Sequence, residues 1–345
     1  MRHLGVHYDT GVQFDPRWLS RPDFDPALAQ YDMRVIAQDL HATSVRIVGE
    51  HLDRLETTAR LAHAAGLSVF FNPWPIGLDL DAQVDRFAEA ARTAQRLRAD
   101  GVELVFVAGC EASIFAHGLI PGDRLEERID WLVSQRGGQE AAPLSVPEVG
   151  EATKAFMRRV VEVVRREFEG EVTYAAGSWE DVDWSEFDYV GVDYYRAEQS
   201  SEDYAAGLRA LQRHGKPVLV LEFGCCAYVG ADRRGGMGWM ILDASDDADV
   251  IWRNGGPPTR DEGTQARYVS EQLGIFDNVG IEGAFVFTFD APYLAHSDDP
   301  QRDFDLAGYG LVAWPEEGAR ASTVLPPWTA KEAFSALAAT YAAMR

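Results

Sequence analysis

Short apolar runs alternate with longer stretches of helical pattern along the whole chain. The short runs show little polar alternation, which is typical of strands buried on both faces of a parallel sheet. Eight strands are predicted: Arg2–Tyr8, Ser44–Val48, Ser68–Asn72, Glu103–Ala108, Val172–Ala176, Tyr189–Tyr194, Val218–Glu222 and Ala284–Phe289. The predicted helices are Pro26–His41, Leu52–Ala65, Leu80–Asp100, Pro147–Phe168, Asp181–Phe187, Glu202–His214, Arg260–Leu273 and Thr329–Met344. Eight β–α units predict a closed (β/α)8 TIM barrel of the α/β class, with residues 1–345 forming a single domain.

An open, doubly wound sheet is the alternative fold, and it is expected to carry a Gly-rich phosphate turn after its first strand. The segment that follows residue 4, Gly-Val-His-Tyr-Asp-Thr-Gly, does not supply such a turn. Long connections follow strands four, seven and eight, over Ala112–Val146, Phe223–Thr259 and Asp290–Pro327, and the first holds a further predicted helix, Arg124–Gln135. Because loops after the strands form the active face of such barrels, we expect a pocket for a small molecule or a chain end.

Composition and charge narrow the choice of partners. The chain is 46% hydrophobic and 25% charged, as in ordinary globular proteins. Thirty-two Lys and Arg against 55 Asp and Glu give a net charge of -23, which argues against nucleic acid and anionic membranes. The three Cys, with no signal-peptide pattern and no long apolar run, predict a cytoplasmic protein with reduced thiols. The sequence leaves the oligomeric state open.

Two of the predicted strands end in glutamate. Strand four runs to Gly109-Cys110-Glu111, and strand seven runs to Leu221-Glu222-Phe223-Gly224. Glycoside cleavage needs one carboxyl group to protonate the leaving oxygen and a second to attack the sugar or steady its developing charge. Strands four and seven face each other across a barrel, so Glu111 and Glu222 are predicted to converge as a catalytic pair. Either residue alone is equally well explained by a structural ion pair.

These two strands resemble the clan A glycoside hydrolases, a family of (β/α)8 barrels. The resemblance implies that Glu111 is the general acid/base and that Glu222 is the nucleophile of a retaining enzyme acting on a glycoside. It also implies that Arg46 supports the nucleophile and that Tyr194 lies near it. The chain departs from the family at Cys110, where an Asn that contacts the sugar 2-hydroxyl is usual, and a thiol is only a weak hydrogen-bond partner.

Other polar and aromatic residues follow the predicted strands and are candidates for binding substrate. Aromatic side chains there can stack against sugar rings, although packing explains them equally well. The predicted substrate-binding residues are His7, Tyr8, Arg46, Asn72, Trp74, Trp179, Asp193, Tyr194, Trp239 and Asp290.

No cofactor is predicted. A metal-dependent site is an alternative, but the spacing of the His residues does not favour it. His7, Asp9, Glu111, Asp193, Glu222 and Asp290 are potential ligands, but the chain has no HxH or HExxH motif. Adjacent Cys225 and Cys226 suit neither a disulfide nor a known nucleophile motif.

Three functions therefore remain: a retaining glycosidase or transglycosidase, a lyase, isomerase or cyclase that uses the same Glu pair, and a sugar-binding protein without turnover. Cys110 favours the second, and the intact Glu pair favours an enzyme over the third.

Overall fold

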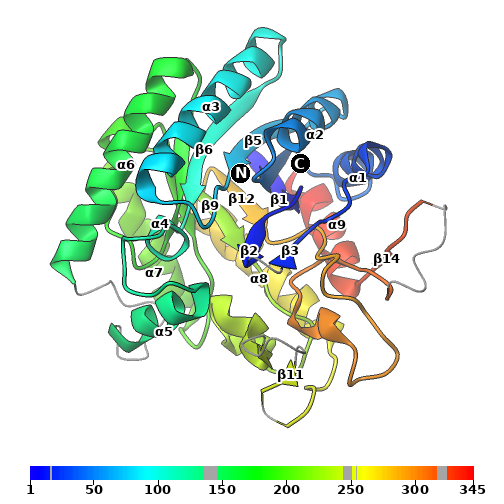
Figure 1. Ribbon diagram of the computed structural model, residues 1–345. Helices are drawn as coiled ribbons and strands as arrows, with labels where there is room; N and C mark the ends of the chain where they lie inside the picture. The colour runs from blue at the N-terminus through cyan, green and yellow to red at the C-terminus, as the bar shows by residue number, and fades with distance from the viewer. Residues whose placement is uncertain (16–17, 136–145, 244–250, 254, 317–324) are drawn as a thin grey trace.

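The computed structural model describes all of residues 1–345 except 16–17, 136–145, 244–250, 254 and 317–324. Eight parallel strands close into a barrel in the spatial order β1-β12-β9-β8-β7-β6-β5-β4 (Figure 1). They are β1 (His3–Asp9), β4 (Ser44–Gly49), β5 (Ser68–Pro73), β6 (Leu104–Cys110), β7 (Val172–Gly177), β8 (Val190–Asp193), β9 (Val218–Phe223) and β12 (Gly283–Val286). Each predicted strand is present, which confirms the TIM-barrel prediction.

Helices surround the barrel; all but the last, α9, connect consecutive barrel strands (Figure 1). They are α1 (Pro26–Gln38), α2 (Leu52–Ala64), α3 (Leu80–Ala99), α6 (Pro147–Glu167), α7 (Ser201–Leu211), α8 (Glu262–Val279) and α9 (Glu332–Met344). The connection between β7 and β8 has only a 3-10 turn, η1 (Trp184–Glu186), where a short helix was predicted. Helix α1 begins as predicted, because the Asp25 side chain accepts a hydrogen bond from the backbone N–H of Ala27 and Pro26 opens the first turn.

The connections between these strands and helices contain smaller elements. After β6 lie α4 (Ala112–Phe115) and α5 (Leu125–Gln135), and α5 matches the predicted extra helix within one residue. The others are β2 (Gln13–Asp15), β3 (Trp18–Leu19), η2 (Gln212–His214), η3 (Ala231–Arg233), η4 (Gly235–Ile241), β10 (Leu242–Asp243), β11 (Ile251–Trp252), η5 (Phe304–Ala307), β13 (Val312–Ala313) and β14 (Thr329–Ala330). Parts of all three predicted long connections fall outside the described residues.

Alternate residues along the strands fill two separate cores. On β9, Leu219 and Leu221 belong to the cluster inside the barrel, whereas Val218 and Val220 pack outward against the helices. The same alternation on β4 sends Val45 and Ile47 outward. Successive side chains on a strand therefore point alternately into the barrel and into the helix layer.

Two β-bulges interrupt this alternation near the C-terminal ends of β6 and β9. The pairing of β8 with β9 shifts between Val192↔Val220 and Asp193↔Glu222. The pairing of β6 with β7 shifts between Val107↔Thr173 and Cys110↔Ala175. A bulge inserts one extra residue and turns the following side chain. Both carboxylate-bearing strands are therefore irregular at the point where they reach the mouth of the barrel.

Candidate active site

Glu222 lies inside the barrel because of the bulge in β9. Adjacent residues of a regular strand point to opposite faces, yet Leu221 and Glu222 both point into the barrel. Leu221 belongs to the interior cluster, and the Glu222 carboxylate contacts Arg46 from β4. Arg46 Nη1 donates to Glu222 Oε1 at 3.0 Å, and the Tyr195 hydroxyl donates to Oε2 at 3.1 Å. Burial is the largest effect and leaves the pKa of Glu222 raised, although the charge of Arg46 and these hydrogen bonds act in the opposite direction. The carboxylate thus has a dedicated cation and a dedicated hydroxyl donor.

Arg46 is a fully buried guanidinium at the centre of the site. Its Nε donates to Asn72 Oδ1 at 2.8 Å, and its Nη1 also donates to the Leu221 carbonyl at 3.0 Å and lies 3.4 Å from Asp193 Oδ1. Burial alone lowers the pKa of Arg46, but the charges of Glu222 and Asp193 raise it above its ordinary value. Arg46 therefore stays charged, and Asn72 fixes its orientation rather than facing open solvent.

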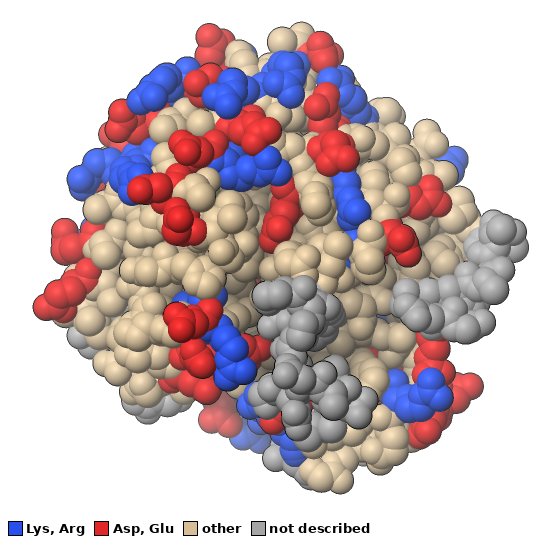
Figure 2. Space-filling model, viewed as in Figure 1, with Lys and Arg blue, Asp and Glu red and all other residues tan. Residues whose placement is uncertain are grey.

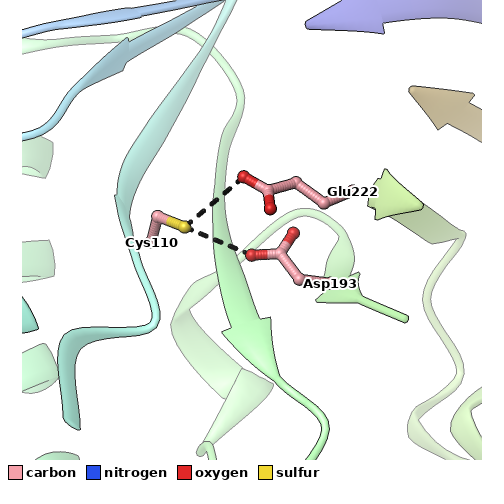
Figure 3. Close-up of side chains that lie close together, drawn as sticks. All are labelled: Cys110, Asp193 and Glu222. Carbon is pink, nitrogen blue, oxygen red and sulfur yellow. Dashed lines mark hydrogen bonds between the residues drawn. The ribbon is translucent and has the colours of Figure 1, made fainter. Parts of the chain in front are cut away.

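Cys110 and Asp193 lie beside Glu222 (Figure 3). The Cys110 Sγ is 3.2 Å from Asp193 Oδ2 and 3.7 Å from Glu222 Oε1. All three side chains are buried. Burial, followed by the charge of Glu222, raises the pKa of Asp193 well above its ordinary value. The thiol at the position before Glu111 is therefore directed at two carboxyl groups of its own chain.

Glu111 follows Cys110 and has an unusual backbone. Its φ of 40° and ψ of 51° lie in the left-handed region, and it precedes the short helix α4. Such strained non-glycine residues are concentrated at functional sites. Burial is the main cause that raises the pKa of Glu111 well above its ordinary value, and the charges that Asp193 and Glu222 carry when they are ionised act in the same direction. Among the described residues no group donates a hydrogen bond to its carboxyl group, and the raised pKa favours its protonated form.

His7 approaches Glu222 from β1. Its Nε2 lies 3.9 Å from Glu222 Oε1 and is buried without a hydrogen-bond partner among the described residues. The Thr288 hydroxyl donates to the His7 carbonyl at 3.1 Å, so its oxygen is free to accept from His7 Nδ1 at 3.0 Å. Burial, then the charge of Arg46, lowers the pKa of His7 well below its ordinary value. The neutral ring thus presents an unpaired acceptor, Nε2, beside the carboxylate.

Three predicted substrate-binding residues do not converge on Glu222. Tyr8 points outward, because its hydroxyl donates to Asp32 of α1 at 2.9 Å. Tyr194 also points outward and packs on Tyr204 of α7, with ring centroids 4.7 Å apart. Asp290 is bound by Arg21 and Trp314, as described next. Strand alternation sends both tyrosine side chains into the helix layer, so neither lies where the prediction placed it.

Asp290 follows β12 and is neutralised within the chain. Arg21 Nη2 donates to both of its carboxylate oxygens at 2.7 Å, and Trp314 Nε1 donates to Oδ2 at 3.1 Å. The Asp290 side chain is fully buried. It fastens the connection after β12 to the segment after β3 and is not presented to a ligand.

The three predicted tryptophan platforms differ in exposure. Trp74 is buried, with its ring edge to Phe14 and Phe115. Trp179 is half-buried, and its Nε1 donates to Ser113 Oγ at 3.0 Å. Trp239, on η4, is half-buried against the apolar cluster that includes Cys225 and Cys226. Trp179 and Trp239 keep part of their surface exposed, whereas Trp74 is mainly a packing residue.

The donor atoms of Cys110, Asp193 and Glu222 lie within 4.8 Å of one another, a spacing that a metal ion can bridge. However, Arg46 Nη1 already contacts both carboxyl groups, at 3.0 and 3.4 Å. A second cation would be held against a buried guanidinium and repelled by it. The arrangement therefore fits an arginine-centred acid cluster better than a metal site.

A surface groove of about 370 Å³ lies elsewhere, between α6 and the connection from β7 to β8. Its lining includes Lys154, Arg158, Asp181 and Phe187 and none of the residues that contact Glu222. We place the candidate site at the strand ends, because buried carboxyl groups with raised pKa values and strained backbone converge there.

Comparison with known proteins supports the fold. No family model and no curated protein sequence matches the chain. Among solved structures, a family 113 β-1,4-mannanase is 14% identical with a TM-score of 0.59, covering 99% of this chain and 98% of its own. A family 5 glycoside hydrolase from Prevotella bryantii B14 is 12% identical with a TM-score of 0.51, covering 99% and 96%.

A β-glucuronidase from Parabacteroides merdae is 13% identical with a TM-score of 0.59, and the match covers 99% of this chain but only 38% of that enzyme. The chain therefore shares the eight-stranded barrel of glycoside hydrolases. At these identities the likeness concerns the fold, and the chemistry has to be argued from the residues themselves.

Proposed function

We propose that the protein is a glycoside hydrolase or transglycosidase that works with retention of configuration through Glu111 and Glu222. The observation that carries the proposal is the contrast between the two carboxyl groups. Glu222 accepts hydrogen bonds from Arg46 and Tyr195, which favour its ionised form. Glu111 has no such donor among the described residues, and its pKa is raised well above its ordinary value by burial and nearby charges. Unequal environments of this kind support Glu111 as the acid and Glu222 as the nucleophile.

In the first step Glu222 attacks the anomeric carbon while Glu111 transfers its proton to the departing glycosidic oxygen. The glycosyl ester that forms leaves Glu111 ionised. Glu111 then removes a proton from water, or from an acceptor hydroxyl, which attacks the ester and releases Glu222 as a carboxylate. The half-buried rings of Trp179 and Trp239 are proposed to contact the sugar, and neutral His7 to accept a hydrogen bond from one of its hydroxyl groups.

A panel of aryl glycosides tests this proposal with wild type, Glu222→Gln and Glu111→Gln. We expect wild-type turnover of at least one glycoside, a fall to background in Glu222→Gln, and a loss of about 10²–10⁴-fold in Glu111→Gln. Glu103→Gln is the matched control, since Glu103 is exposed beside the other end of β6 and should leave turnover unchanged. Full activity in both Glu111→Gln and Glu222→Gln would refute the proposal.

Retention is tested separately on whichever glycoside is turned over. Proton NMR of the first product should show the anomeric configuration of the substrate, and the inverted anomer would assign a single-displacement mechanism instead.

A second function is favoured by one observation, the orientation of Cys110. Its thiol faces Asp193 and Glu222, so it is not available for a sugar hydroxyl. A lyase, isomerase or cyclase that uses Glu111 and Glu222 as acid and base needs no such contact. This alternative would be favoured if the wild-type protein bound aryl glycosides but turned none of them over.

A further inference from the structure

The candidate site holds more carboxyl groups than it has positive charge. Asp193 is fully buried and contacts Arg46 and Cys110, and the cation is shared with Glu222. His7 is neutral and adds no charge. The charged and titratable groups that face Asp193 in the described part of the chain are Arg46 from β4, Cys110 from β6, Glu111 before α4, Glu180 after β7, Tyr195 after β8 and Glu222 from β9.

The hydrogen bonds indicate which carboxyl group keeps the negative charge. Arg46 Nη1 is 3.0 Å from Glu222 and 3.4 Å from Asp193, and Tyr195 donates to Glu222 alone. Asp193 therefore has the weaker set of donors and the fully buried side chain. Two ionised carboxylates this close, with one cation between them, repel each other strongly. The proton accordingly belongs on Asp193, on Oδ2, which faces the Cys110 thiol rather than Arg46.

We propose that Asp193 is a neutral carboxylic acid and acts as a positioning residue for Glu222. Its Oδ2–H donates to Cys110 Sγ, and the Cys110 thiol in turn points its hydrogen at Glu222 Oε1. The separations of 3.2 and 3.7 Å allow this chain of two hydrogen bonds. The charge of Arg46 then neutralises Glu222 alone. The catalytic importance of this arrangement rests on the proposed function.

A neutral Asp193 also keeps the negative charge of the site equal to the positive charge of Arg46 in both states of the proposed reaction. In the resting enzyme Glu222 is ionised and Glu111 carries a proton. In the glycosyl-enzyme Glu222 is an uncharged ester and Glu111 is ionised. Both states hold one negative charge against Arg46, provided that Asp193 remains protonated. Such a balance avoids an uncompensated buried charge in either state.

Infrared spectroscopy tests the protonation state without any substrate. Asp193→Asn has nearly the same shape as a protonated Asp193 but lacks the carboxylic acid. We expect the spectrum of wild type minus Asp193→Asn, near neutral pH, to contain a carboxylic acid C=O stretching band. A difference spectrum without this band would overturn the proposal, whether or not the protein is a glycosidase.

Kinetics on an active glycoside test the positioning role. Asp193→Asn should keep kcat/KM within about tenfold and leave the basic limb of the pH profile in place, whereas Asp193→Leu should lose about a hundredfold because Arg46 and Cys110 lose a partner. A shift of the basic limb in Asp193→Asn to lower pH by about one unit would overturn the proposal. It would mean that an ionised Asp193 had been raising the pKa of Glu111.

Discussion

Adjacent tyrosines after β8 have opposite surroundings. Asp193 faces the barrel interior, Tyr194 turns outward onto Tyr204, and Tyr195 turns inward and donates to Glu222. This is the two-residue alternation of an extended chain continued beyond the strand. The resemblance to known glycosidases placed a tyrosine near the nucleophile but selected Tyr194, and alternation counted from Asp193 would have selected Tyr195.

Replacing Tyr195 with Phe should move the acid limb of the pH profile. The hydroxyl donates to Glu222 Oε2 at 3.1 Å and so favours the ionised carboxylate. Without it the pKa of Glu222 rises, and because the nucleophile has to be ionised, the acid limb of kcat/KM moves to higher pH. We expect kcat/KM near neutral pH to fall by about tenfold, as for one lost hydrogen bond to a charged group.

The matched control for this variant is Tyr194→Phe. The Tyr194 ring packs on α7, and a Cβ added at Gly207 would lie only 2.0 Å from its hydroxyl, so that oxygen lies against the helix. Its removal should leave both limbs of the profile unchanged. An equal shift in both variants would contradict the assignment of Tyr195 as the donor.

Individual residues of the site were predictable where they end strands, and their contacts were not. The resemblance predicted that Arg46 supports Glu222, and Arg46 Nη1 lies 3.0 Å from Glu222 Oε1. The partner of the Cys110 thiol was not predicted, because a contact between β6 and β8, which lie on either side of β7, depends on register. Thr288, which fixes the His7 ring, carries no local signal that distinguishes it from other threonines.

At the scale of the elements, the apolar runs predicted every barrel strand, since strands buried on both faces leave a continuous signal. Helix ends were less accurate: α8 continues to Val279, beyond the predicted Leu273. The bulges of β6 and β9 were not predicted, because they arise from the stagger between neighbouring strands. Regular alternation would have sent Glu222 outward, and only the bulge explains why its carboxylate meets Arg46.

Strand β8 passes close to β7 at Gly191, and this close approach predicts that a larger residue there lowers the stability of the fold. A Cβ added at Gly191 would lie 2.3 Å from the Tyr174 carbonyl and 2.6 Å from Thr173 Oγ1. Backbone cannot yield as a flexible side chain can, so Gly191→Ala should destabilise the fold by about 1–3 kcal/mol. Urea denaturation should show a lower midpoint with an unchanged slope.

Gly274→Ala provides the opposite expectation. Gly274 lies within α8, and an added Cβ would meet nothing within 4 Å. Alanine is the better helix former, so this variant should gain about 0.5–1 kcal/mol. A loss of stability in Gly274→Ala comparable with that in Gly191→Ala would mean that the crowding at β8 is not the cause.

For the whole molecule, the net charge is -23. Figure 2 shows Lys and Arg side chains among Asp and Glu over the upper part of one face. Ion pairs between exposed side chains also occur on single helices, such as Arg60 with Glu56 on α2. Exposed pairs of this kind contribute little to stability. No helix among the described residues has the length and apolar character needed to cross a bilayer. Buried charged groups are therefore expected to affect the stability of the fold more than these exposed pairs do.

One such group joins the connections that cover the barrel mouth. Arg260, which precedes α8, donates to Asp305 Oδ2 at 2.7 Å and to Asp303 Oδ2 at 3.2 Å, and both acids belong to the connection after β12. Lys331 Nζ lies 3.0 Å from Asp305 Oδ1, and both side chains are almost fully buried. Asp305 is thus the shared counter-ion of two cations from different segments.

Asp305→Asn should therefore destabilise the whole fold and not merely one loop. Removing the shared anion leaves Lys331 buried without its charge partner, for which losses of about 3–5 kcal/mol are typical. Chemical denaturation should show this loss as a lower midpoint, while Asp298→Asn, at an exposed position of the same connection, should change stability by less than about 0.5 kcal/mol. Equal stability of the two variants would show that the connections are held by their apolar contacts, among them Tyr309 and Leu306, rather than by this ion cluster.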